Sequence, residues 1–195
     1  IVRGCKSRSA QQEQSGETAD AQQNAPESVV PTEPDTTVTI AAVGDIMMYD
    51  EQLDAARQDD GTYDFTSSFA AVSGSTVSAD LTVGNLELNF CGEPYSGKPD
   101  FRAPESLAKT LSSIGFDVLQ TANTYSIQNG LSGLQSTIRY LDAAGLSHVG
   151  TYAAQDDKTS LGGVLLKNVN GVKIAFIAYT KGLNYLTLPE GEEYA

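Results

Sequence analysis

Histidine is almost absent from this chain of 195 residues, because His148 is the only one. A site that needs two or more imidazoles therefore cannot be built from these residues alone. Cysteine is nearly as scarce, and the two present, Cys5 and Cys91, form no CxxC pair. Two cysteines cannot support a disulfide-rich scaffold. We expect Cys91 to be a free, buried thiol, with a disulfide to Cys5 as the alternative.

Long apolar runs and positive charge are also lacking. The longest uninterrupted apolar run, at 174–179, spans six residues, whereas a helix across a bilayer needs about 20. The chain has 12 Lys and Arg against 25 Asp and Glu, which gives a formal net charge of −13. Nucleic acids and anionic lipid surfaces are bound mainly through Lys and Arg, so this balance argues against both as partners.

Residues 1–37 differ in composition from the rest of the chain. They contain no aromatic residue and three of the seven prolines. Such a segment cannot bury enough apolar surface to offset the entropy lost on ordering. We predict a disordered polar linker over 1–37 and one folded domain over 38–195. Cys5 stands in a context faintly typical of a bacterial lipoprotein signal, so lipidation of Cys5 is one hypothesis and a stray cysteine in a tail is the other.

Apolar periodicity predicts an α/β domain. Strands are expected at 37–43, 81–83, 116–121 and 146–149, where short apolar runs end in polar or glycine residues. Apolar residues at helical spacing predict one helix from Pro104 to Gly115 and another over 131–145. Alternation of strand and helix is typical of a sheet built by crossover connections. Asn170-Gly171 between two further apolar runs predicts a hairpin, and hence a mixed sheet.

Polar side chains follow three of the predicted strands. Asp45 follows the first, Asn85 and Glu87 follow the second, and Asn123 follows the third. In open α/β sheets ligands bind beyond the carboxyl ends of strands, so these side chains are expected to meet. Carboxylate and amide oxygens suit a hard cation such as Mg²⁺ or Mn²⁺. The alternative is that they only form turns, since Asp and Asn often bond the backbone two residues on.

Several sequence blocks resemble one bacterial family. They are GDIMM at 44–48, ADLTVGNLE at 79–87, FRAP at 101–104, GFDVLQTAN at 115–123, GLSGLQSTIRYLDAAGLSHVGTY at 130–152 and KIAFIAYT at 173–180. In this order they are similar to capsule and poly-gamma-glutamate biosynthesis proteins of the CapA type, over roughly residues 37–182. The resemblance implies an αββα sandwich of the calcineurin-like metallophosphatase type, of which only the first half is expected here. Pairing of two copies through the sheet face left open is a further expectation.

The resemblance also implies a metal site with two divalent ions that activate water against a phosphate ester. Asp45, Asn85, Glu87 and Asn123 match family ligand positions. The family typically has Asn-His where this chain has Thr124-Tyr125.

These replacements remove groups that the chemistry needs. Threonine is a poor neutral ligand. Tyr125, at the family's histidine position, is the candidate catalytic residue, although its phenol cannot exchange protons near pH 7 as imidazole does. Gln128 stands where the family has Asp, and the family's later His-Trp-Gly segment and His-rich loop do not occur in this chain. A bound Mn²⁺ or Mg²⁺ is therefore expected to be weak or lost.

Two functions remain open from the sequence. The first is a catalytically impaired envelope protein related to capsule or poly-gamma-glutamate synthesis, at the outer face of the bacterial cytoplasmic membrane. The second is a divalent-metal phosphoesterase acting on an envelope polymer or a lipid-linked intermediate. Arg102, in the FRAP block, is a candidate to bind an anionic polymer. Tyr125 and Tyr179 could stack against a sugar ring, although aromatic residues near strand ends more often serve packing.

Overall fold

The computed structural model describes residues 36–195, apart from the side chains of residues 159–161. The chain divides into two units, Ile1–Pro34 and Asp35–Ala195. Residues 1–35 of the predicted linker, Cys5 among them, lie outside the described residues. The described helices and strands belong to the second unit.

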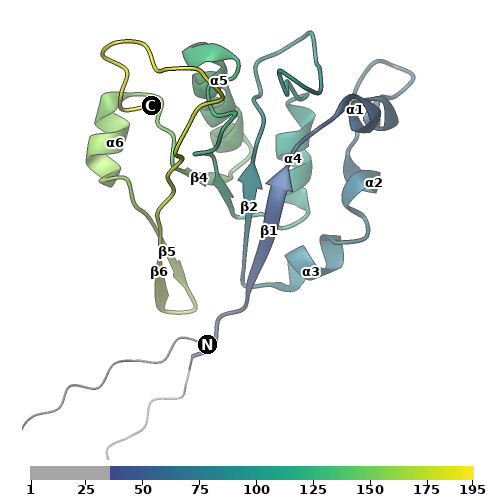
Figure 1. The fold of residues 1–195 in the computed structure, drawn as a ribbon. Coiled ribbons are helices and arrows are strands. Elements are labelled where there is room, and N and C mark those ends of the chain that lie inside the picture. The colour runs from purple at the N-terminus through teal and green to yellow at the C-terminus, as the bar shows by residue number, and fades with distance from the viewer. Residues whose placement is uncertain (1–35) are drawn as a thin grey trace, which may run out of the picture. The chain divides into compact units, whose positions relative to one another are not determined.

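Four parallel strands form the central sheet, in the order β1-β2-β3-β4 (Figure 1). They are β1 (Ile40–Ile46), β2 (Leu81–Leu86), β3 (Val118–Gln120) and β4 (Ser147–Val149). Each of the four was predicted, but β1 begins three residues later and runs three residues further than expected. β2 likewise continues to Leu86, so Asp45 and Asn85 lie inside strands rather than in the loops after them.

Six helices occur within the described residues. They are α1 (Asp50–Ala56), α2 (Thr66–Phe69), α3 (Ser73–Ser78), α4 (Ser106–Ser113), α5 (Gly130–Ala143) and α6 (Gln155–Leu161). The two predicted helices are α4 and α5, whose apolar stripes are buried, and each is followed by a glycine with positive φ, Gly115 and Gly145. The other four have no predicted counterpart, because helices of four to seven residues are too short to show an apolar stripe.

The Asn170-Gly171 turn forms the predicted hairpin. Both turn residues have positive φ (52° and 85°), as the tight hairpin turn requires. The turn joins β5 (Leu165–Val169) to β6 (Val172–Phe176). These two strands make an antiparallel sheet of their own rather than extending the parallel one. Residues 36–195 therefore form two sheets, where the sequence pattern had indicated one mixed sheet.

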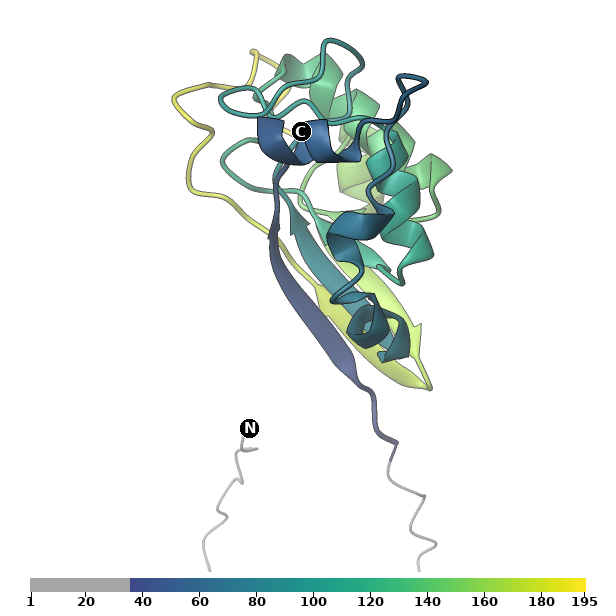
Figure 2. The same cartoon turned by 90° about the vertical axis from the view of Figure 1, so that its right-hand side faces the viewer.

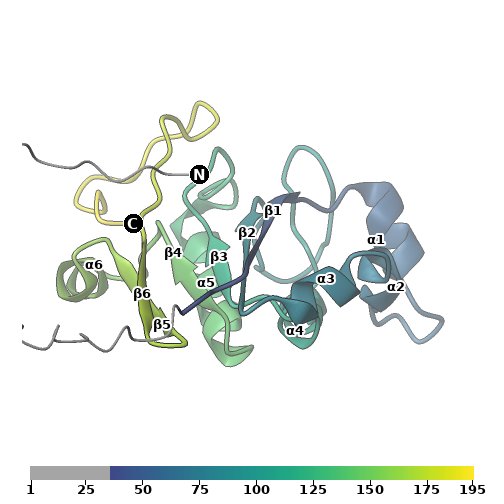
Figure 3. The same ribbon diagram turned by 90° about the horizontal axis from the view of Figure 1, so that it is seen from below.

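The two faces of the parallel sheet carry different partners. Side chains alternate along each strand, so Leu86 and Leu119 pack in the helix-side core, while Leu81 and Val118 pack against the hairpin. Figure 2 shows the helices gathered on one side of the strands, and Figure 3 shows α6 and the hairpin at the opposite end of the sheet from α1 and α2. This α/β architecture confirms the predicted fold class and is compatible with part of a metallophosphatase-type sandwich.

One carboxylate ties the two sheets together at the end away from the polar loops. Asp80 accepts a hydrogen bond from the Thr39 backbone N–H at 2.7 Å, and another from the Asn170 side chain at 3.0 Å. The start of β1 and the hairpin turn are thereby fixed to the same residue. These hydrogen bonds lower the pKa of Asp80.

The β5–β6 hairpin leaves part of one face of the parallel sheet uncovered. A groove of about 370 Å³ runs between Val43, Val83 and Val118 of the sheet and Phe176 and Ile177 at the end of the hairpin. Parallel sheets are normally buried on both faces. Pairing of two copies through this face stays a prediction. No helix within residues 36–195 combines the length and the apolar character needed to cross a membrane.

His148 provides a test of packing beside the sheet. It lies in β4, its side chain is 16% exposed, and its Nε2 is 3.8 Å from Asp142 Oδ1. Burial lowers the pKa of His148 below its ordinary value, with Asp142 opposing. The unfolded chain therefore takes up a proton on His148 at a higher pH than the folded chain, and this contribution to stability is lost as pH falls below about 6.5.

We predict that the stability advantage of wild type over His148→Gln is smaller at pH 5.5 than at pH 7.5. Urea unfolding of both chains at the two pH values measures this, because titrations common to both cancel in the difference. An advantage that is constant with pH would contradict the proposed burial of a neutral imidazole.

Candidate functional site

The polar residues predicted to meet do lie together at the carboxyl edge of the parallel sheet. Asp45 lies near the end of β1 and Asn85 near the end of β2, and the two are direct neighbours across the strands. Glu87 follows β2 directly, and Asn123 lies in the turn after β3. Parallel strands end at the same edge of a sheet, so residues from three separate segments of the chain converge there.

A bulge in β1 gives Asp45 its orientation. Ala42 pairs with Val83 and Asp45 pairs with Asn85, so β1 uses three steps where β2 uses two. Because side chains alternate along a strand, the extra residue places Asp45 on the same side of the sheet as Asn85. A regular strand would instead have turned Asp45 toward the helix-side core.

The carboxamide of Asn85 joins the two carboxylates. Its Nδ2 donates to Asp45 Oδ1 at 2.8 Å and to Glu87 Oε2 at 3.0 Å. Two like charges are thus held on either side of one neutral donor group. This hydrogen bonding compensates part of the repulsion that would otherwise separate the two acids.

Asn123 fixes the carboxamide of Asn85 in this orientation. Its Nδ2 donates to Asn85 Oδ1 at 3.1 Å and to the Leu86 carbonyl at 2.8 Å. Its own Oδ1 accepts from the Tyr125 backbone N–H at 3.1 Å, two residues on. The turn-forming role that sequence analysis held as an alternative is therefore present for Asn123, together with the contact to Asn85. The side chain is only 8% exposed, so the cluster has a rigid side.

Ser126 is a member of the site that sequence reasoning missed. It is buried, and its Oγ accepts from the Asn123 backbone N–H at 2.8 Å and lies 2.6 Å from the Thr121 carbonyl that it donates to. Ser126 thus closes the turn that carries Asn123. The spacing Asn-x-x-Ser after a strand is the signal that could have indicated it.

The surroundings of Glu87 shift the pKa of its carboxyl group. Burial raises the pKa of Glu87, the negative charge of Asp45 raises it further, and the hydrogen bond from Asn85 opposes both. Asp45 is exposed and Glu87 is half-buried. The charged form of Glu87 is therefore disfavoured in the folded chain.

The residues at the family's amide and imidazole positions do not enter the cluster through any hydrogen bond of their side chains. Thr124 is exposed. Tyr125 packs edge-to-face on Phe101, with ring centroids 4.7 Å apart, and joins the rim of the helix-side core. Gln128 accepts a hydrogen bond from Asn184 at 2.9 Å. A catalytic role for Tyr125 stays a prediction.

Arg102 is engaged with its own loop. Its Nη2 donates to three backbone carbonyls, those of Cys91, Gly92 and Glu93, at 3.0–3.3 Å. Its backbone pairs with Ser96 in both directions. The half-buried guanidinium therefore holds the loop around residues 91–102 together, and its proposed contact with an anionic polymer stays a prediction.

The donor set suits one hard cation better than two. The two carboxylates are oxygen donors of the kind that Mg²⁺ and Mn²⁺ accept, with water completing the shell. The carboxamide oxygens of Asn85 and Asn123 already accept hydrogen bonds, from Asn123 and from the Tyr125 backbone N–H. Within residues 36–195 no group of three or more His, Cys, Asp and Glu side chains is placed to hold a metal. His148 lies on β4 beside Asp142. Binding of a divalent cation by the remaining oxygen donors stays a prediction.

Comparison with known proteins gives a consistent picture. The family model described as bacterial capsule synthesis protein PGA_cap matches residues 39–194. The capsule biosynthesis protein CapA of Bacillus anthracis is 29% identical over 149 residues, which cover 73% of this chain and 34% of the relative. The PGA biosynthesis protein CapA of Bacillus subtilis is 26% identical over 158 residues, 77% of this chain and 39% of the relative. An uncharacterized protein of Sinorhizobium fredii is 35% identical over 81 residues, 37% of this chain and 17% of its own length.

The raised pKa of Glu87 generates a test of the cluster. An acid whose pKa is raised on folding destabilises the folded chain at neutral pH, and this penalty disappears as pH falls through the folded pKa. We therefore predict that Glu87→Gln is more stable than wild type at pH 7, by about 0.5 kcal/mol. Glutamine keeps an acceptor for Asn85 while removing the charge.

Urea unfolding at pH 7 and pH 4 measures the effect, with the exposed Glu51→Gln in α1 as the matched control. The gain should shrink at pH 4, where Glu87 is protonated in wild type. A loss of stability at pH 7 would show that the charge of Glu87 is stabilising and would contradict the prediction.

Proposed function

The chain belongs to the bacterial capsule synthesis protein family PGA_cap, and we propose that it serves capsule or poly-gamma-glutamate synthesis at the cell envelope without catalysing hydrolysis by itself. The proposal draws on the names of the two Bacillus relatives, which assign them to capsule biosynthesis and to PGA biosynthesis. The chain spans about a third of the length of these relatives. The activity, substrate and partners of a whole protein of this kind are therefore part of the proposal.

The observation that carries the non-catalytic role is the composition of the polar cluster. Two-metal hydrolysis needs donors for both ions and a group that exchanges protons near pH 7. Here two carboxylates share one carboxamide, and Tyr125, at the position of the family's histidine, is packed on Phe101. The described residues offer the cluster no imidazole.

We propose that the cluster holds one divalent cation weakly. Asp45 and Glu87 would supply charged oxygens. Asn85 and Asn123 would supply carboxamide oxygens only if these gave up the hydrogen bonds that they accept. A bound cation would supply Lewis-acid chemistry and a docking point for an anionic group. The present hydrogen bonds weaken this binding. Asn85 already donates to one oxygen of each carboxylate, and a cation competes with these hydrogen bonds.

A divalent-metal phosphoesterase is the second candidate. The observation that favours it is the convergence of Asp45, Glu87 and Asn123 on Asn85 at the carboxyl edge of the sheet. Ligand sites occupy this edge in open α/β sheets. The substrate would then be a phosphate ester of an envelope polymer or of a lipid-linked intermediate.

A titration with Mn²⁺ after chelation tests the metal site. We predict that the wild-type chain binds one Mn²⁺, with a dissociation constant on the order of 1 mM, and that Asp45→Asn abolishes binding. Asp54→Asn, a change of an exposed acid in α1, is the matched control. Mn²⁺ electron paramagnetic resonance counts the free ion directly, and binding that survives in Asp45→Asn would contradict the assignment.

The same Mn²⁺-loaded chain separates the two functions. We expect no hydrolysis of bis-p-nitrophenyl phosphate above that of Asp45→Asn. Turnover by wild type that Asp45→Asn abolishes would favour the phosphoesterase and overturn the non-catalytic proposal.

We further propose that the protein is held at the outer face of the cytoplasmic membrane by a lipid on Cys5. Lipidation at one cysteine gives membrane affinity without a spanning helix. Cys5 lies outside the described residues, so this rests on the sequence context alone. Growth of the native host with labelled palmitate should label the chain, and Cys5→Ser should lose the label. An unlabelled wild-type protein would contradict the anchor.

A further inference from the structure

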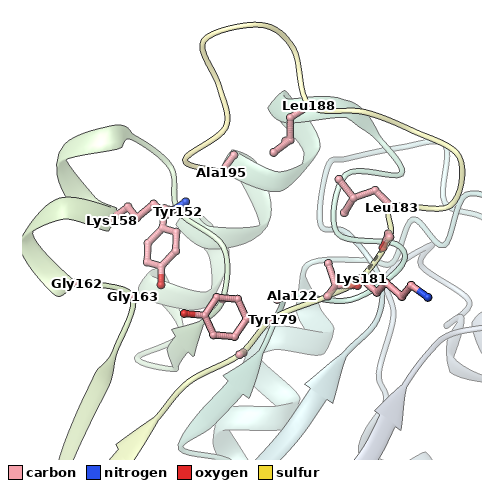
Figure 4. Close-up of a pocket in the computed structure, with 14 residues that line it drawn as sticks. Ala122, Tyr152, Lys158, Gly162, Gly163, Tyr179, Lys181, Leu183, Leu188 and Ala195 are labelled. Atoms are coloured by element: carbon pink, nitrogen blue, oxygen red, sulfur yellow. Dashed lines mark hydrogen bonds between the residues drawn. The ribbon is translucent and has the colours of Figure 1, made fainter.

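A cavity of about 360 Å³ lies beside the polar cluster (Figure 4). Its wall includes Ala122, directly before Asn123, together with Tyr152 beyond β4 and the segment 178–183 beyond β6. Small-molecule sites typically measure about 300–1,000 Å³. The cavity is thus of ligand size and lies on the same edge of the sheet as the cluster.

Two tyrosines shape this cavity in different ways. Tyr152 is 7% exposed, and its hydroxyl forms no hydrogen bond with any of the described residues. Tyr179 is 84% exposed and reaches toward Tyr152 (Figure 4). This hydroxyl is available to water or to a molecule in the cavity, because Tyr152 forms part of the cavity wall. The ring of Tyr179 offers such a molecule an aromatic face.

Glycines keep the wall beside Tyr152 open. Gly162 and Gly163 both have positive φ, where the chain turns from α6 into β5. A Cβ on Gly163 would lie 3.6 Å from the Tyr152 hydroxyl. The chain therefore passes this hydroxyl without placing a side chain over it.

The charged side chains that line the cavity are opposite in sign to the net charge of the domain, and the last residue of the chain, Ala195, also lines it. Residues 38–195 carry nine Lys and Arg against 19 Asp and Glu. The side chains that line the cavity include Lys158 and Lys181 and no Asp or Glu. The Lys158 ammonium lies 5.9 Å from the centre of the Tyr152 ring and donates to the Glu193 carbonyl at 3.1 Å, which leaves two of its three N–H donors.

We propose that this cavity binds an acidic sugar unit. The aromatic face of Tyr179 would receive the C–H face of the sugar ring, because the face of an aromatic ring is electron-rich. The Tyr152 hydroxyl would bond a ring substituent, and the Lys158 ammonium, which lies beside the Tyr152 ring, would bind the carboxylate. The assignment rests on the proposed envelope function, whose polymer it specifies, while the residues involved are separate from the metal ligands.

Binding of methyl β-D-glucuronide to the 195-residue chain, followed by ¹H–¹⁵N NMR, tests the assignment. The matched neutral probe is methyl β-D-glucoside, which has the same ring without the carboxylate. We expect the glucuronide to bind about tenfold more tightly than the glucoside. Absence of glucuronide binding, or equal binding of the two probes, would overturn the proposal.

Two variants with matched controls locate the site. Tyr179→Ala should weaken glucuronide binding about tenfold, while Tyr185→Ala, a change of a fully exposed tyrosine outside the cavity wall, should leave it unchanged. Lys158→Gln should remove the preference for the acidic probe, whereas the exposed Lys109→Gln in α4 should keep it. Both cavity changes having no effect would overturn the assignment.

Two further titrations separate this proposal from its premise. Tyr179→Ala should still bind Mn²⁺ as wild type does, and Asp45→Asn should still bind the glucuronide. Loss of metal binding alone would refute the metal site and leave the sugar site standing. A γ-glutamyl-glutamate dipeptide that binds through Tyr179 and Lys158 while the glucuronide does not would overturn the sugar assignment in favour of a peptide polymer.

Discussion

The carboxamide of Asn85 is the constraint on which the carboxyl edge of the sheet depends. Its nitrogen bonds one oxygen of Asp45 and one of Glu87, and its oxygen is held by Asn123. Two carboxylates close together repel each other, and one charge must be compensated or neutralised. Asn85 supplies compensation without adding charge, and it stands on β2, between the strand that carries Asp45 and the strand that leads to Asn123. These hydrogen bonds engage one oxygen of each carboxylate and the oxygen of Asn85, so a cation that used these atoms would compete with bonds that already exist.

The two faces of the parallel sheet are covered to different extents. On one face the helices bury Leu86 and Leu119 completely. On the other face the β5–β6 hairpin covers Leu81, Val118 and Val149 and leaves the β1 side open. The polar cluster and the lysine-bearing cavity both lie at the edge where strands end, close to the segment that leaves the hairpin. The proposed cation site and the proposed polymer site therefore share one edge of the sheet.

The sequence predicted the four parallel strands, helices α4 and α5, and the hairpin, because each has a buried apolar pattern and a clear terminating residue. It also predicted that Asp45, Glu87 and Asn123 would converge. Their orientations could not be predicted, because they depend on a bulge in β1 and on the buried hydroxyl of Ser126. The cavity was missed for a similar reason. Tyr152 and Lys158 become neighbours only through the packing of α6, which is too short to show an apolar stripe.

The bulge in β1 has a consequence for how this strand can change over evolutionary time. Substitution at residues 42–44 leaves each later side chain of β1 on its present face of the sheet. Loss of one residue there would move each of them to the opposite face. Asp45 would then point into the helix-side core, and Ile46 would point to the face that now carries Asp45 and Asn85. Removal of one residue from this strand would therefore displace the acidic group as effectively as substitution of Asp45 itself.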